Sequence, residues 1–124
     1  MRLTIVPGRF AVCRLPADAP IPSSVAGTSL VSITRTASEL SIVCPEAVAT
    51  EGARTETGWR CVAVQGPIPF TATGILASVL VPLADAEVGI FAVSTFDTDY
   101  ILLKEAQLDE AVAALKEAGH EFGD

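Results

Sequence analysis

The second half of the chain alternates between the apolar spacing of strands and that of helices. Residues 59–65 predict a strand with apolar side chains on both faces, and residues 73–86 predict an unusually apolar helix. After the opening residues of this helix and before Pro82, Ser78 is the only polar side chain, so the helix must be covered on more than one side. Pro82 lacks an N–H group and removes the hydrogen bond to the carbonyl of Ser78, which predicts a kink or a weak point.

Two further strands and a second helix complete the predicted pattern of this half. Residues 89–95 and 100–104 have strand-like composition and flank a polar turn. From Leu108 onward, apolar side chains recur at the spacing i, i+3, i+4 and i+7, which predicts a last helix that ends before Gly119. With a short closing strand at 120–122, the predicted order is β, α, β, β, α, β.

The first half is richer in strands and in proline. Its pattern predicts two strands joined by a turn at Pro7-Gly8, an irregular proline-rich crossover, a hairpin and an exposed polar loop. The predicted strands are 3–6, 9–15, 30–34 and 40–44, the crossover is 15–24 and the polar loop is 51–58.

The two halves of the chain share a weak internal sequence similarity. Residues 33–47 resemble residues 93–106, because both have hydroxyl side chains in a turn, then an apolar run, then Glu-Ala. This indicates a small α/β module duplicated once, with the proline-rich crossover in place of the first helix of the earlier copy. We therefore predict two units, residues 1–57 and 58–124.

The charge and the hydropathy of the chain argue against nucleic-acid-binding and membrane-spanning classes of protein. Eight Lys or Arg residues are scattered among fifteen Asp or Glu residues, for a formal charge of −7, which argues against nucleic acid and anionic membranes as partners. The mean hydropathy is +0.48, but the apolar runs are too short to span a bilayer. The N-terminus does not have the pattern of a secretory signal, so we expect a cytoplasmic protein.

The sequence lacks the motifs that are typical of catalytic and metal-binding sites. Cys13, Cys44 and Cys61 lack metal-ligand spacing and have apolar neighbours, so we expect buried, reduced thiols. Nucleophile, dinucleotide and phosphate-loop motifs are missing, and we expect no catalytic residue, no metal and no cofactor. An enzyme would need a deep pocket with an ionisable pair of displaced pKa values.

Polar residues with a use for ligand binding occur at two places. The start of the apolar helix, at Thr73 and Gly74, offers free N–H groups and the positive end of the helix dipole, which suit a carboxylate. The turn at 94–99 supplies hydroxyl and carboxylate side chains. The alternatives are a helix start satisfied by Thr hydroxyls, and aspartates that accept hydrogen bonds from their own turn.

For two further residues, the sequence allows two alternative roles each. Arg35, in the matching turn of the first half, is either a solvated charge or a side chain that faces the same cleft. His120, the only histidine, follows Gly119 at a helix end, where capping is favoured over catalysis.

Three segments together resemble a known family. GPIPFTATGILASVLVPLADAEVGIFAVSTFDTDYILLKE, SLVSITRTASELSIVCPE and GWRCVAVQGP are similar to ACT-domain proteins that bind amino acids, in particular to the subgroup related to the eukaryotic cytosolic arginine sensor. The resemblance covers most of the chain. It implies an α+β fold of two tandem ACT-like (ferredoxin-like βαββαβ) units with antiparallel sheets and helices on one face, of which 1–57 is degenerate and 58–124 is a full ACT domain.

The resemblance also implies where a ligand lies, namely between two ACT-like units, against the helix start and the polar turn. Residues at the helix start would present N–H groups to an amino-acid carboxylate, and Asp99 would pair with the α-ammonium or with a cationic side chain. The implied ligand-binding residues are Thr73, Gly74, Ile75, Ser94, Thr95, Phe96, Thr98 and Asp99. The sensor relative has four ACT-like units, so a second copy of this chain is a candidate for enclosing the site.

These observations predict a non-enzymatic, cytoplasmic protein that binds a small molecule, an amino acid, and acts as a sensor or regulatory module. The alternative is a structural or protein-interaction ACT module that has lost its ligand, with its cleft filled by side chains such as Phe70, Phe96 or Tyr100. The uncovered sheet edges and the apolar helix predict self-association, with a homodimer as the expected form.

Overall fold

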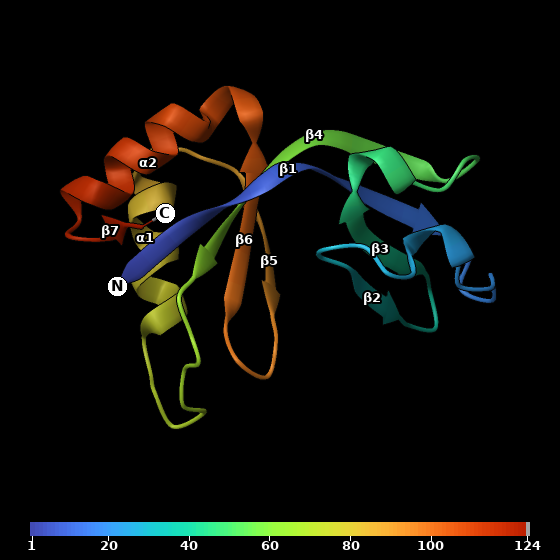
Figure 1. The fold of residues 1–124 in the computed structure, drawn as a ribbon, viewed down its shortest axis with the longest axis horizontal. Coiled ribbons are helices and arrows are strands. Elements are labelled where there is room, and N and C mark those ends of the chain that lie inside the picture. Colours follow the sequence, from blue (N-terminus) through green and yellow to red (C-terminus); the bar gives the residue numbers. More distant parts are fainter. Residues whose placement is uncertain (124) are drawn as a thin grey trace. The chain divides into compact units, whose positions relative to one another are not determined.

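The computed structural model describes residues 1–123 (Figure 1). Within this range the structure contains three short 3-10 helices, which are Ser23–Val25 (η1), Glu46–Val48 (η2) and Glu105–Gln107 (η3). The remaining elements are, in chain order, β1 (Arg2–Leu15), β2 (Ser32–Arg35), β3 (Leu40–Pro45), β4 (Arg54–Val64), α1 (Ile75–Asp85), β5 (Ile90–Ser94), β6 (Asp99–Lys104), α2 (Leu108–Glu117) and β7 (Glu121–Phe122).

The residues group into two compact units. One consists of Gly8–Trp59 and is called the N-terminal unit below. The other combines Met1–Pro7 with the chain from Arg60 onward and is called the helical unit. Strands β1 and β4 each contribute one part to each unit.

The helical unit has the predicted order β, α, β, β, α, β, from β4 to β7. Within it β4 pairs with β6, β6 pairs antiparallel with β5, and β7 pairs parallel with the start of β1. Helices α1 and α2 lie on the same side of β6 and β5 (Figure 1). Alternate residues of β4 and β6 meet both helices in one core, which comprises Leu3, Val62, Val64, Val79, Leu83, Val88, Ile101, Leu103, Ala111 and Leu115.

Pro82 lies inside α1, as predicted, and its missing N–H group is compensated from outside the helix. The carbonyl oxygen of Ser78 accepts a hydrogen bond from Nε2 of His120 at 2.8 Å. The His120 ring therefore serves α1, whereas only the backbone N–H of His120 closes the end of α2, on the carbonyl of Leu115. The predicted capping role of this histidine is correct for its backbone and wrong for its ring.

The N-terminal unit contains the predicted hairpin, β2 and β3, and β3 also pairs antiparallel with β1. The predicted turn at Pro7-Gly8 is wrong, because β1 runs through it without a break. Gly8 has φ of +90°, a conformation that glycine adopts without steric cost, so the strand passes the proline with a local irregularity.

The predicted polar loop at 51–58 is also partly wrong, since β4 begins at Arg54. Residues 54–57 are exposed, as expected, and yet they belong to a strand. Pairing of the backbone with the neighbouring β1 does not require apolar side chains on a solvated stretch, and the polar composition concealed the strand.

Arg35 is exposed, as the prediction of a solvated charge requires, but its guanidinium is also bound to the backbone. Its Nη1 atom donates to the carbonyl of Ala17 and its Nη2 atom donates to the carbonyl of Ala19, at 2.8 Å for the second bond. The planar guanidinium thus ties the proline-rich crossover to the end of β2, within the N-terminal unit.

We expect Arg35→Lys to loosen this crossover, because an ammonium group does not reproduce the two-pronged geometry of a guanidinium. The free energy of unfolding should fall by about 1 kcal/mol, and proteolysis within 16–24 should become faster. Arg14→Lys is the matched control, because Arg14 makes one such bond, to the Ser38 carbonyl at 3.1 Å, which lysine can replace. Equal behaviour of the two variants in urea unfolding would contradict the assigned role.

The three cysteines are free and buried, as the sequence predicted. Burial raises the pKa of the Cys61 thiol to about 12. Burial, and then the neighbouring Cys13, raises the pKa of the Cys44 thiol to about 11. The thiols of Cys44 and Cys61 are therefore protonated near neutral pH.

The raised thiol pKa values predict a loss of stability at alkaline pH. An unfolded chain releases its thiol protons near the ordinary value of 9.0, whereas the folded chain retains them up to about 11 or 12. The free energy of unfolding should therefore be unaffected by these groups well below pH 9 and fall above it, by at most about 1.4 kcal/mol per pH unit for each thiol. Urea unfolding at several pH values measures the slope, and Cys61→Ala should make it shallower.

Candidate functional site

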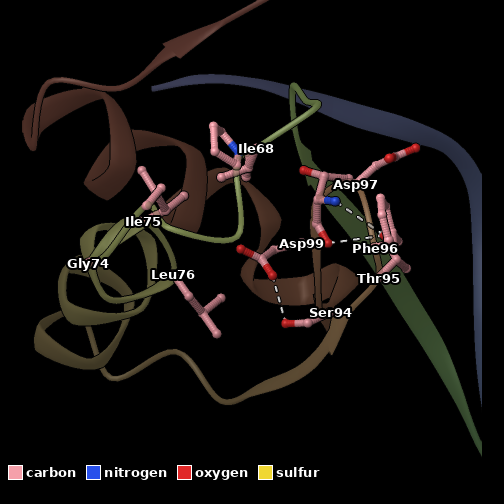
Figure 2. Close-up of a pocket in the computed structure, with 12 residues that line it drawn as sticks. Ile68, Gly74, Ile75, Leu76, Ser94, Thr95, Phe96, Asp97 and Asp99 are labelled. Carbon is pink, nitrogen blue, oxygen red and sulfur yellow. Dashed lines mark hydrogen bonds between the residues drawn. The ribbon is translucent and has the colours of Figure 1, made fainter.

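Three segments of the helical unit surround an open pocket of about 250 Å³. They are the loop before α1, the first turn of α1 and the turn between β5 and β6, and Figure 2 shows them facing one another. The lining residues are Ile68, Pro69, Ala72, Gly74, Ile75, Leu76, Ser94, Thr95, Phe96, Asp97, Thr98 and Asp99.

The pocket brings together most of the residues that the sequence singled out. Gly74 and Ile75 lie on one side, and Ser94, Thr95, Phe96, Thr98 and Asp99 lie on the other. Thr73 is adjacent in sequence but does not line the pocket. All lining residues belong to the helical unit, so this pocket is formed within one unit rather than by residues of two.

The first turn of α1 opens on the pocket without a side-chain cap. Gly74 is the N-cap residue, with φ of +75°, and its carbonyl accepts a hydrogen bond from the N–H of Ser78 at 2.9 Å. The first turn contains no acidic residue. The alternative in which Thr hydroxyls cap this helix is therefore wrong, and the N–H groups of the first turn have no intrahelical partner.

Asp99 presents a carboxylate to this helix start. Its Oδ1 atom accepts a hydrogen bond from the Ser94 hydroxyl at 2.6 Å, and Figure 2 shows the carboxylate directed toward the first turn of α1. The bond joins the last residue of β5 to the first residue of β6, which are register partners. Pairing of the two strands thus fixes the position of the carboxylate.

The other hydroxyl groups of the turn hold the turn itself. Thr95 Oγ1 accepts from the N–H of Thr98 at 3.2 Å, and the Thr95 N–H donates to the Thr98 carbonyl at 2.8 Å. Thr98 Oγ1 donates to the carbonyl of Val64 at 2.5 Å. These threonines act as supports for the pocket wall.

The loop before α1 is attached to the same turn. The N–H of Ile68 donates to the Asp97 carbonyl at 2.6 Å. The rings of Phe70 and Phe96 meet edge to face with centroids 4.7 Å apart, although Phe70 is 73% and Phe96 78% exposed. Gly66 allows this approach, because a Cβ atom there would lie 2.9 Å from the Asp97 carbonyl oxygen.

Sequence reasoning missed the contribution of this loop, which supplies Ile68, Pro69 and Ala72, and it also missed Leu76. It included Asp97 in the polar turn but not among the implied ligand-binding residues. The sequence could have indicated that this loop lines the pocket, because the loop leads directly into the predicted helix and has to pass beside its first turn. Apolar side chains in a loop do not by themselves indicate a binding role, however, and the position of this loop depends on the Ile68–Asp97 hydrogen bond.

The pocket presents hydrogen-bond donors on one wall and a carboxylate on the other. Backbone N–H groups at the helix start suit a carboxylate, and Asp99 across the pocket suits an ammonium group. Within residues 1–123, no three His, Cys, Asp or Glu side chains are grouped so as to hold a metal ion. In the same described range, every helix is too short or too polar to cross a membrane.

Comparison with protein families gives two matches along the chain. A family model described as an ACT domain matches residues 54–117. A second model, described as an N-terminal domain, matches residues 8–50.

Solved structures give matches over nearly the whole length. Protein Atu0741 from Agrobacterium tumefaciens is 42% identical, with 98% of this chain and 91% of that chain covered and a TM-score of 0.92. Protein VC0802 from Vibrio cholerae, of unknown function, is 16% identical, with coverages of 94% and 88% and a TM-score of 0.74. The ligand-free regulatory subunit of aspartate kinase from Thermus thermophilus is 10% identical, with coverages of 94% and 97% and a TM-score of 0.67. The last two similarities show the fold alone.

Proposed function

This chain belongs to the ACT domain family, and from that membership and the pocket we propose that it is a non-enzymatic protein that binds an amino acid and acts as a sensor or regulatory module. The fold of the helical unit is ACT-like, a mixed α/β fold with antiparallel pairing and two helices. The proposal therefore concerns the ligand and the role, which the fold leaves open.

One observation carries the proposal: an uncapped, acid-free helix start faces a fixed carboxylate across a cavity of about 250 Å³. A helix start normally takes a cap from a neighbouring side chain. Here the opposite wall includes Ser94 and Asp99, and Ser94 already donates to Asp99. An amino-acid carboxylate would supply the missing acceptor, and its ammonium group would supply a donor to Asp99.

In the proposed binding mode, the N–H groups at Gly74, Ile75 and Leu76 contact the ligand carboxylate. The side chain of the ligand extends along Ile68 and Phe96, which provide apolar surface beside the polar groups. Thr95 and Thr98 contribute mainly by holding the turn.

The proposed architecture is a tandem of ACT-like units, residues 1–57 degenerate and 58–124 complete, in the subgroup related to the cytosolic arginine sensor. The order β2, β3, η2 in the first part repeats as β5, β6, η3 in the second, which supports a duplication. We also propose a cytoplasmic homodimer in which a second copy encloses the open side of the pocket.

The alternative is a structural or protein-interaction ACT module that has lost its ligand. It expects aromatic side chains to fill the cavity, whereas Phe70 and Phe96 are mostly exposed and meet each other edge to face. The exposed pair would instead suit a protein contact in that alternative.

Isothermal titration calorimetry and thermal unfolding with each of the twenty amino acids test the proposal. A ligand at 100 times its Kd should stabilise the folded chain by about 2.7 kcal/mol. Heat of binding and a shift in the unfolding temperature with one or a few amino acids are expected. A folded chain that responds to none of them would contradict the proposal.

A further inference from the structure

The pocket is built from a part of the chain that carries no positive charge. Residues 61–103 contain no Lys, Arg or His, and none of the lining side chains is cationic. Asp99 faces the first turn of α1, and Asp97 lies at the rim with its side chain directed away from that helix (Figure 2). An anionic group bound here is therefore neutralised only by backbone N–H groups.

The surrounding unit reinforces this bias. Its segments Met1–Pro7 and Arg60 onward contain four Lys or Arg residues against ten Asp or Glu residues. The N-terminal unit, Gly8–Trp59, contains four against five. The negative charge of the chain is thus concentrated in the unit that forms the pocket, where it repels anions at long range.

The place for a carboxylate in this pocket is the helix start. The first turn of α1 offers a group of N–H donors without intrahelical partners, and the ligand's main-chain carboxylate occupies it in the proposed binding mode. A second carboxylate on the ligand would share the cavity with Asp99 and would find no cation. Placing a carboxylate beside a like charge, with no cation among the lining side chains, is unfavourable.

Resting on the proposed amino-acid site, we propose that the pocket selects its ligand by charge. It takes amino acids with neutral or basic side chains and rejects aspartate and glutamate. The selection is made by what the wall lacks: the apolar residues Ile68, Ala72 and Leu76 occupy positions where a pocket for acidic amino acids would need a cation.

Calorimetry on the full chain with glutamine against glutamate, asparagine against aspartate, and the other amino acids tests the selection. We expect both acidic amino acids to bind at least about tenfold more weakly than the tightest binder and than their own amides where these bind. Binding of either acid within tenfold of the tightest binder would overturn the charge selection and leave the amino-acid site intact. Binding of no amino acid would overturn the proposed function and the selection with it.

A variant separates charge from shape. Ala72 is exposed, lines the pocket and uses only its backbone N–H in a hydrogen bond, to Pro69, so Ala72→Lys should fold. We expect it to bind glutamate about tenfold or more tightly than the parent protein does. Ala77→Lys adds the same charge at an exposed position of α1 outside the pocket and should leave glutamate binding unchanged. No gain in Ala72→Lys, or an equal gain in both variants, would show that charge in the pocket is not the cause.

Discussion

Asp99→Asn is expected to weaken amino-acid binding by about 10- to 100-fold, the range for loss of a hydrogen bond between charged groups. The substitution keeps the size of the side chain and can still accept from the Ser94 hydroxyl, which lies 2.6 Å from Oδ1. It removes the negative charge that would pair with the ligand ammonium group. The measurement is the Kd, by calorimetry, of the amino acid that gives the largest thermal shift with the unaltered chain.

Asp85→Asn is the matched control for this prediction. Asp85 is exposed at the last position of α1 and does not line the pocket, so its substitution changes the net charge equally without touching the ligand. Ser94→Ala should lie between the two, because it frees the Asp99 carboxylate without removing it. If Asp99→Asn and Asp85→Asn bind equally well, the ammonium contact is at another residue.

The elements of the helical unit were predictable because their side-chain periodicities are clear. The spacing of Leu108, Ala111 and Leu115 predicts α2, and the last two are fully buried in the structure. The strand 89–95 corresponds to β5, Ile90–Ser94. Local spacing fixes α2 because it buries one face against the core, and β5 keeps the alternation of a strand although none of its residues is fully buried.

The errors arose where tertiary pairing outweighs local sequence. Pro7-Gly8 has the composition of a turn, but the pairing of β1 on either side of it keeps the chain extended. The exposed residues 54–57 form a strand for the same reason. Arg35 finds its partners at Ala17 and Ala19, and no pattern in the sequence predicts contacts with main-chain carbonyls.

The candidate site was half predictable for a related reason. Hydroxyl and acidic side chains in the turn, and the start of the apolar helix, are visible in the sequence, and the structure brings Gly74 and Asp99 to one pocket. The separate roles of the hydroxyl groups in the turn could not be predicted. The Thr98 hydroxyl donates to the Val64 carbonyl, whereas the Ser94 hydroxyl donates to Asp99. Those partners depend on the register of the sheet.

A second large effect is expected at His120, which supports the helix that opens on the pocket. His120 is 7% exposed, and its Nε2 donates to the Ser78 carbonyl, the acceptor that Pro82 leaves free. Because a carbonyl oxygen only accepts, Nε2 carries the proton. Ser78 in turn donates its N–H to the carbonyl of Gly74, so the histidine holds the first turns of α1 through one residue.

We expect His120→Leu to lower the free energy of unfolding by about 2 kcal/mol, because it leaves a carbonyl in the middle of a helix without its partner. Leucine retains most of the volume of the imidazole, so the loss reports the hydrogen bond more than a cavity. Urea unfolding measures it, and an unchanged slope with denaturant would show that the folded and unfolded states keep their compactness.

The double-mutant cycle with Pro82→Ala identifies the mechanism. Alanine restores an N–H group at position 82, which can donate to the Ser78 carbonyl within α1. In the Pro82→Ala background, His120→Leu should therefore cost about 1 kcal/mol less than in the parent chain. Leu115→Ala, a core truncation in α2, is the control, since its cost should be the same in both backgrounds. Equal costs of His120→Leu in the two backgrounds would mean that the ring stabilises the unit by packing alone, and that the missing N–H of Pro82 is not what it compensates.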